Sequence, residues 1–256
     1  MTAEALTVTD LSVRFGGLVA NNAISLSLPP QSIGAVVGPN GAGKTTLFNA
    51  ISGAIRPTSG RIRFGDRDIT ETSASARGRL GISRTFQNLS LVEDLSAVDN
   101  VTVGLGRFRH TGLLSAMISS PRSLRTDRAI RDCARSALAF VGLAGAADRP
   151  TGHLNYGDRR RVEIARAIAL APSLLLLDEP SAGMGPSETA ELAELFFATK
   201  REMGCSILVV EHDMTMVRAI AEFTVVLDNG AVISDGETAA VLADPAVAAA
   251  YLGSQR

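Results

Sequence analysis

The sequence contains no tryptophan, two cysteines and only two lysines among its 256 residues. Cys133 and Cys205 are too few and too far apart for a disulfide framework, and no Cys/His spacing resembles a zinc site. So few cysteines without a disulfide framework are typical of proteins in the reducing cytosol. Neither sign of charge is in excess, because 25 basic and 26 acidic side chains leave a net charge of −1. We therefore expect no general attraction to nucleic acid and no nucleic-acid partner.

Long hydrophobic runs are also missing. The longest predominantly apolar run, residues 167–177, is interrupted by Pro172 and falls short of the ~20 residues that cross a bilayer. The N-terminal segment carries acids instead of a basic region and lacks a long apolar stretch, so we expect no secretory signal there. Any membrane role is predicted to depend on partner proteins.

Hydrophobic residues make up 46% of the chain, which is enough for a substantial core. No repeat and no low-complexity linker divides the sequence, so we expect one domain over residues 1–256. Apolar and polar residues alternate over 6–15 and 23–28, which predicts strands of an N-terminal antiparallel subdomain. Residues 95–171 lack strand-like runs and predict an inserted helical subdomain spanning about 89–171.

Strand and helix patterns alternate on both sides of that insertion. An apolar run at 33–37 precedes glycines and a helical stretch, and the same alternation resumes at residue 174. The expected later elements are strand 174–177, helix 187–203, strand 205–210, helix 213–222 and strand 223–227. This order predicts an α/β fold with a mostly parallel sheet. Asn229-Gly230 predicts a hairpin turn and a short antiparallel edge after it.

Residues 38–45 read GPNGAGKT, which matches the P-loop pattern. In this pattern backbone N–H groups surround phosphates, the lysine reaches the β- and γ-phosphates, and the hydroxyl binds Mg²⁺. The loop follows an apolar strand and opens a helix, so phosphates would meet a helix N-terminus. A plain glycine-rich turn is the alternative reading. The predicted nucleotide-binding residues of this loop are Gly38, Asn40, Gly41, Gly43, Lys44, Thr45 and Thr46.

Two acids, Asp178 and Glu179, end the apolar run Leu174–Leu177. The carboxyl edge of a parallel sheet is where open α/β folds bind ligands. We expect Asp178 to hold Mg²⁺, together with Thr45, and Glu179 to act as general base toward the attacking water. A helix cap and a solvated surface acid are the alternative roles.

Two further polar residues follow apolar strands and point to the same edge, namely Gln87 and His212. A glutamine can approach both the metal and the attacking water, and a histidine can donate a hydrogen bond to γ-phosphate charge. We therefore expect both in the catalytic site and Gln87 also near the metal. A histidine in this position can equally be a structural residue.

Residues 154–169 read LNYGDRRRVEIARAIA and resemble the signature segment of ABC ATPases. With the P-loop, Gln87, the acid pair and His212 in order, the resemblance covers essentially the whole chain. It implies a P-loop NTPase core of ABC type, with ATP and Mg²⁺ as cofactors. It further implies that two cassettes pair head to tail, with Asn155 and Gly157 contacting the γ-phosphate held by the other subunit. Phe15 stands where the family places an aromatic residue against adenine, although a core phenylalanine is the alternative.

Two positions depart from the family pattern. Asn155 replaces the usual serine or alanine, and its amide can still donate a hydrogen bond to phosphate. Gly185 stands before Pro186 where the family commonly has an aspartate or asparagine, which leaves communication between the two ATP sites in doubt. Arg159, Arg160 and Arg161 suggest a nucleic-acid or lipid contact, but an amphipathic helix explains most of that segment.

Gly43 and Gly157 lie 114 positions apart, too few for the long coiled coil of chromosome-maintenance ABC ATPases. Several stretches, such as Tyr251-Leu252-Gly253, look like the larger ATP-binding subunit of branched-chain amino acid uptake systems. The resemblance implies a second ATP-binding cassette, which is either a paralogous subunit or a second copy of this chain. It also implies two transmembrane permease subunits, indirectly a solute-binding protein, and a peripheral location on the cytoplasmic membrane face. Alternatives are a cassette of a urea or amide importer or of a lipid exporter, or a soluble regulatory nucleotide-binding module.

Overall fold

The computed structural model describes residues 5–85, 91–105 and 121–253. The chain divides into two compact units, which we call the core unit (Met1–Gln87 and Ser173–Arg256) and the helical unit (Asn88–Pro172). The core unit holds two sheets, one antiparallel and one mostly parallel, and the helical unit interrupts it in sequence. This arrangement confirms the predicted α/β class with an antiparallel subdomain and an inserted helical part.

The antiparallel sheet of the core unit has four strands in the order β2-β1-β4-β5. Their bounds are β1 Leu6–Phe15, β2 Leu18–Leu28, β4 Ser59–Phe64 and β5 Arg67–Asp68. β4 alternates buried and exposed side chains, with Ile62 and Phe64 in the core between exposed arginines. One face of this sheet is therefore apolar and the other is solvated, as expected for antiparallel pairing.

The second sheet has six strands in the order β10-β9-β3-β8-β7-β6, all parallel except the β9–β10 hairpin. Their bounds are β3 Ile33–Val37, β6 Ile82–Arg84, β7 Leu174–Asp178, β8 Ser206–Val210, β9 Phe223–Asp228 and β10 Ala231–Glu237. Every residue of β3, β7 and β8 is buried. These continuous apolar runs occupy the middle of a parallel sheet covered on both faces.

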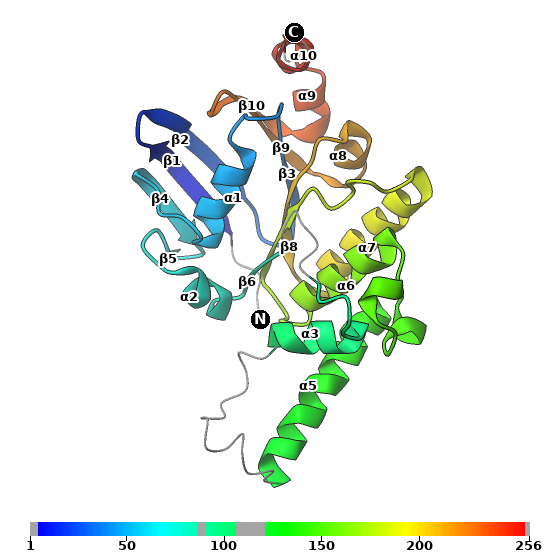
Figure 1. Cartoon of the computed structure of the whole chain (residues 1–256). Helices are drawn as coiled ribbons and strands as arrows, with labels where there is room; N and C mark the ends of the chain where they lie inside the picture. Colours follow the sequence, from blue (N-terminus) through cyan, green and yellow to red (C-terminus); the bar gives the residue numbers. More distant parts are fainter. Residues whose placement is uncertain (1–4, 86–90, 106–120, 254–256) are drawn as a thin grey trace. The chain divides into compact units, whose positions relative to one another are not determined.

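Helix α1 (Lys44–Ser52) packs between the two sheets (Figure 1). Leu47, Phe48 and Ile51 are fully buried, in one apolar cluster with residues of both sheets. The remaining helices of the core unit are α2 Ala74–Arg79, α7 Pro186–Met203, α8 Met214–Ile220, α9 Thr238–Leu242 and α10 Pro245–Gly253. The core thus fixes α1, and with it the loop that precedes α1, against the sheet edge.

In its described residues the helical unit contains α3 (Ala97–Leu105), α5 (Pro121–Phe140) and α6 (Tyr156–Ile168), which pack on one another. Short 3-10 turns at Ala144–Ala146 and Thr151–His153 join α5 to α6. Asn100 is buried at the centre, where its side-chain nitrogen donates to the carbonyls of Val92 and Leu95. Over the described residues, no helix is long and apolar enough to cross a membrane.

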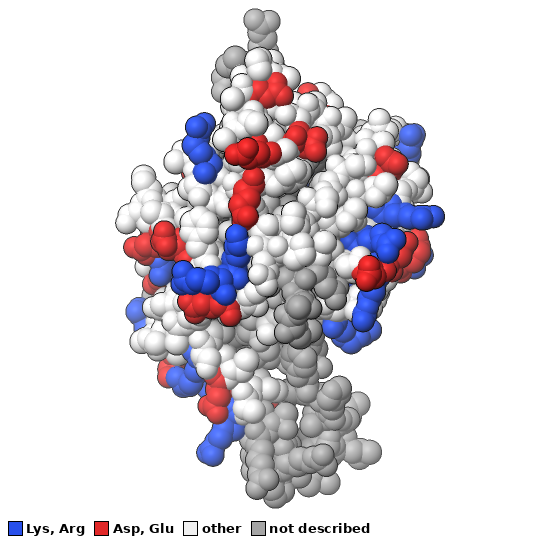
Figure 2. Space-filling view, turned by 180° about the vertical axis from the view of Figure 1, so that it is seen from behind, with Lys and Arg blue, Asp and Glu red and all other residues white. Residues whose placement is uncertain are grey.

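The face seen in Figure 2 carries acidic and basic side chains interspersed over the described residues. The pattern agrees with the net charge of −1. This face therefore presents a mixed field and no broad patch of one sign to an approaching partner.

Candidate active site

The loop between β3 and α1 is built around three glycines with positive φ, which are Gly38 (147°), Gly41 (82°) and Gly43 (95°). A Cβ at Gly38 would come within 2.1 Å of the Leu227 carbonyl oxygen, and one at Gly43 within 2.4 Å of the Ala20 carbonyl oxygen. At Gly41 a Cβ would meet nothing within 4 Å. The first and third glycines are thus required by both conformation and close packing, and the second by conformation alone.

Lys44 is the first residue of α1, and its side chain folds back along the loop. Its Nζ donates to the carbonyl oxygens of Gly38 (2.7 Å) and Pro39 (2.9 Å), and the residue is 6% exposed. Burial lowers the pKa of Lys44, and the carboxylates of Glu179 and Asp178 oppose that shift. The helix starts at Gly43 without a side-chain cap and without an acid in its first turn. Its first N–H groups can therefore face an anion.

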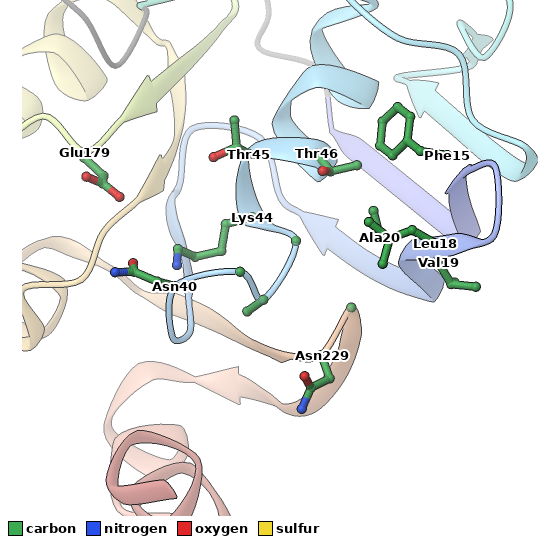
Figure 3. Close-up of a pocket in the computed structure, with 14 residues that line it drawn as sticks. Phe15, Leu18, Val19, Ala20, Asn40, Lys44, Thr45, Thr46, Glu179 and Asn229 are labelled. Carbon is green, nitrogen blue, oxygen red and sulfur yellow. The ribbon is translucent and has the colours of Figure 1, made fainter. Parts of the chain in front are cut away.

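A cavity of about 450 Å³ opens beside this loop (Figure 3). One wall is formed by residues of β1 and β2, and another by the P-loop and Thr45 and Thr46 of α1. Its lining residues are Phe15, Leu18–Ala20, Asn40–Thr46, Glu179, Asn229 and Gly230. The size suits a nucleotide-sized ligand.

Phe15 lines this cavity and is 52% exposed, so it is not a core phenylalanine. Asn229 and Gly230 were predicted only as a hairpin turn, and they also border the cavity. Gly230 is fixed there because its N–H donates to Ala42 and its carbonyl accepts from Asn22. The dipeptide signals a turn, but it carries no signal for its position beside the P-loop.

Asp178 ends β7 with its side chain 2% exposed, and its Oδ2 forms an ion pair with Arg84 Nη2 at 2.9 Å. The metal expected here is Mg²⁺, which prefers oxygen donors. The Asp178 carboxylate and the Thr45 hydroxyl provide that donor chemistry, so the residues present fit the ion. Sequence reasoning did not find the partnership with Arg84.

Glu179, the next residue, has φ of 46°, a left-handed conformation that is uncommon for a residue with a side chain. Its N–H donates to the Val210 carbonyl at 2.9 Å, which holds the turn against the end of β8. The side chain is 21% exposed and lines the same cavity as the P-loop. This unusual backbone aims the carboxylate into the cavity instead of along the strand.

His212 follows β8 and lies beside Glu179, with 3.9 Å between His212 Nδ1 and Glu179 Oε2. This separation is longer than a hydrogen bond, and the imidazole is 56% exposed. Glu211, which sequence reasoning missed, is fully buried and accepts from the N–H (2.9 Å) and hydroxyl (2.8 Å) of Ser181. Glu211 thus ties the turn containing Glu179 to the strand that carries His212.

Gln87 lies outside the described residues. The strand that leads to it is placed, since the Thr85 N–H donates to the Leu176 carbonyl at 3.0 Å and continues the β6–β7 ladder. The structure therefore places Glu179 in the wall of the P-loop cavity with His212 next to it, while Gln87 stays a sequence prediction.

The geometry of a P-loop beside the acids Asp178 and Glu179 agrees with a match to a family model described as ABC transporter, over residues 21–182. The chain belongs to the ABC transporter family. It is 38% identical over 253 residues to the high-affinity branched-chain amino acid transport ATP-binding proteins BraF of Pseudomonas aeruginosa and LivG of Escherichia coli K12. Each alignment covers 99% of this chain and 99% of the relative.

Solved ABC cassettes have the same fold. A nucleotide-free ATP-binding cassette from an ABC transporter matches with a TM-score of 0.86 and 28% identity over 97% of this chain and 98% of that chain. The ADP conformation of the cassette MJ1267 matches with a TM-score of 0.84 and 29% identity over 98% of this chain and 99% of that chain. The chain is thus a nucleotide-binding ABC ATPase, and the predicted cassette fold is confirmed.

The signature residues of this ABC cassette lie in the helical unit at the start of α6. Asn155 is the N-cap, with its Oδ1 accepting from the Asp158 N–H (2.7 Å) and its Nδ2 donating to Asp158 Oδ2 (3.0 Å). Gly157 is buried in the first turn. Asn155 therefore has a local role as a cap, and contact of either residue with a second cassette stays a prediction.

Gly185, the other departure from the ABC pattern, is the N-cap of α7. Its N–H donates to Glu188 Oε2 at 2.9 Å, and Pro186 occupies the first helical position. With φ of −78°, the position has no need of glycine. The Gly185 N–H is thus bonded without an aspartate there, but this N-cap provides no side-chain acceptor to the first turn of α7.

Proposed function

We propose that this ABC cassette hydrolyses MgATP to drive import of branched-chain amino acids through membrane-spanning partner subunits. The observation that carries the proposal is the 38% identity over 99% of the chain to two relatives named for that transport. The cavity beside the P-loop supports the nucleotide part, because it combines phosphate-binding backbone, a lysine and a carboxylate.

The chain's own residues supply most of the chemistry in this proposal. The P-loop N–H groups and Lys44 bind the phosphates, and Phe15 stacks on the base. Glu179 accepts a proton from the attacking water, and His212 donates a hydrogen bond to charge that develops on the γ-phosphate. Thr45 and Asp178, with Gln87 as a further predicted ligand, would hold Mg²⁺, which neutralises phosphate charge when bound.

The partners in this proposal follow from what one chain lacks. Asn155 and Gly157 belong to the helical unit and are proposed to complete the ATP site of a second, paralogous cassette. Two permease subunits would receive the motion, and a solute-binding protein would deliver the solute to them. We infer a peripheral position on the cytoplasmic face of the membrane.

The proposal can be tested by uptake of labelled leucine, isoleucine and valine in cells that carry Glu179→Gln in place of the native chain. We expect loss of all three uptakes at equal protein level. Glu194→Gln is the matched control, because Glu194 is an exposed acid on α7, and it should leave uptake unchanged. Undiminished uptake in the Glu179→Gln cells would overturn the proposed solute class.

A second experiment tests the proposed partner subunits. The chain is purified in mild detergent from its own membranes, and the proteins that accompany it are identified by mass spectrometry. Two membrane-spanning subunits and a second ATP-binding chain are expected. Recovery without any membrane partner would favour the regulatory module considered above.

A further inference from the structure

Arg84, the last residue of β6, connects two parts of the active site that lie on different elements. Its Nη2 pairs with Asp178 Oδ2 at 2.9 Å, and its Nη1 donates to Asn49 Oδ1 (2.6 Å) and Ser52 Oγ (3.1 Å) of α1. The side chains of Arg84 and Asp178 are only 9% and 2% exposed. The contacts are therefore shielded from solvent and from salt.

Only the forked shape of a guanidinium suits this position. One arm reaches the acid at the end of β7, while the other reaches polar groups on α1. The guanidinium carbon also lies 5.9 Å from the centre of the Phe48 ring, within the range of a cation–π contact. A lysine has a single point charge and cannot hold both partners in fixed directions.

The two elements joined by Arg84 each carry one candidate Mg²⁺ ligand. Thr45 lies in the first turn of α1, and Asn49 is one turn further along the same helix. Asp178 lies at the end of β7, and β6 is hydrogen-bonded to β7 along its length. Arg84 therefore braces the helix that carries the hydroxyl ligand against the strand that carries the carboxylate ligand.

We propose that Arg84 is a positioning residue for the metal site, which fixes Asp178 relative to the nucleotide-binding helix. The inference rests on the proposed function, in which Thr45 and Asp178 hold the Mg²⁺ of MgATP. Partners that hydrogen-bond to metal ligands orient them, and their loss costs about 10- to 100-fold in metal affinity. Arg84 thus sets how much Mg²⁺ contributes to nucleotide binding without contacting the nucleotide.

The test measures the affinity of the full chain for a non-hydrolysable ATP analogue, with Mg²⁺ and with EDTA. The ratio of the two affinities reports the metal contribution without any turnover. Arg84→Lys keeps the charge and removes the fork, so it should lower this ratio by about tenfold or more and leave the affinity in EDTA unchanged. Asn49→Ala removes one partner of the fork and should lower the ratio by less.

Arg77→Lys is the matched control. Arg77 is 1% exposed and also holds α1, through hydrogen bonds from its Nη1 to the Ala50 (2.6 Å) and Ile51 (2.7 Å) carbonyls. Its other hydrogen bonds within the described chain run to the carbonyls of Thr70 and Thr72, so it braces α1 but not Asp178. Arg77→Lys should lower the melting temperature and leave the metal ratio unchanged.

The outcomes separate the two proposals. No Mg²⁺ enhancement in the native chain would overturn the proposed MgATP site and Arg84's role with it. If Mg²⁺ raises the affinity for the ATP analogue as much in Arg84→Lys as in the native chain, the Arg84 inference alone is overturned. The same holds if Arg84→Lys loses affinity equally with Mg²⁺ and with EDTA. If Arg84→Lys does not fold, the test depends on Asn49→Ala. An unchanged ratio of the affinities with Mg²⁺ and with EDTA in that variant would refute the positioning role of Arg84.

Discussion

The core unit and the helical unit each contain a buried arginine–carboxylate pair, and the two pairs are built differently. Arg84 and Asp178 lie on neighbouring strands, and the arginine also binds α1. Arg160 and Glu163 lie three positions apart on α6, at 2.7 Å and with exposures of 1% and 0%. Arg166, on the same helix, also pairs with Glu163 at 3.6 Å.

The comparison teaches that burial of an ion pair does not by itself mark a functional site. The pair in α6 is the more deeply buried, yet both of its residues lie on one helix. The pair in the core unit joins three elements, and its acid immediately precedes a residue that lines the cavity. We expect substitutions near the Arg84–Asp178 pair to change nucleotide binding and hydrolysis. Substitutions in the Arg160–Glu163 pair should change stability.

The largest effect is expected at Glu179, on the catalytic side of this comparison. Glu179→Gln keeps the size of the side chain but cannot take a proton from water, so hydrolysis should fall by about 10²- to 10⁴-fold. Phosphate release and nucleotide titration of the purified chain measure rate and binding separately. Binding and melting temperature should be retained, and an unchanged rate would exclude Glu179 as the general base.

The helical unit should respond in the opposite way. Arg160→Met removes one partner of the buried pair, whose acid also contacts Arg166 at 3.6 Å. Breaking a buried pair costs about 3 to 5 kcal/mol, so the free energy of unfolding should fall by about that amount. Urea unfolding measures this loss. The double variant Arg160→Met/Glu163→Leu should recover most of it, and normal stability of the single variant would contradict the comparison.

The elements that could be predicted from sequence are those with a long or periodic pattern. The runs at 33–37 and 174–177 and the alternation from 187 to 227 match β3, β7, α7, β8, α8 and β9 within three residues. β4 and β5 were not predicted, because β5 has two exposed charged residues and β4 is short and rich in arginine. β4 is specified by pairing with β1, and β5 by pairing with β4, and a local pattern contains neither pairing.

The candidate site could also be predicted from the sequence only in part. Motif spacing was enough to place Glu179 and His212 at one sheet edge, where they lie 3.9 Å apart. Arg84 and Asp178 are 94 positions apart in sequence, and their contact depends on β6 lying next to β7. Strand order is a long-range property, so the brace at Asp178 and the role of Glu211 could not be read from the chain.

A contrast of the same kind lies inside the P-loop itself. Gly43→Ala would force a Cβ to within 2.4 Å of a backbone oxygen, whereas Gly41→Ala meets open space. Both carry the cost of a left-handed conformation, about 1 to 2 kcal/mol. Nucleotide titration should therefore show binding abolished in Gly43→Ala and weakened by about 5- to 30-fold in Gly41→Ala. Equal losses would mean that conformation matters and packing against β2 does not.

The smallest effect compares the first residues of α6 and α7. Asn155 caps α6 with its side chain, so Asn155→Ala should lower the free energy of unfolding by about 1 kcal/mol. Gly185 has no side chain, and its N–H is already held by Glu188, so Gly185→Ala removes no side-chain cap and should lower the free energy of unfolding by less than Asn155→Ala does, although glycine is the better N-cap of the two residues. Urea unfolding compares the two variants.

Asn155→Ser separates the two roles of Asn155, because serine caps a helix about as well but is shorter than the amide. If Asn155 also donates to a phosphate held by a second cassette, this variant should keep the stability of the native chain and lose part of the hydrolysis rate of the assembled transporter. Full activity together with full stability would leave Asn155 with the capping role alone, and the helical unit would then contribute to the ATP site through the backbone at Gly157.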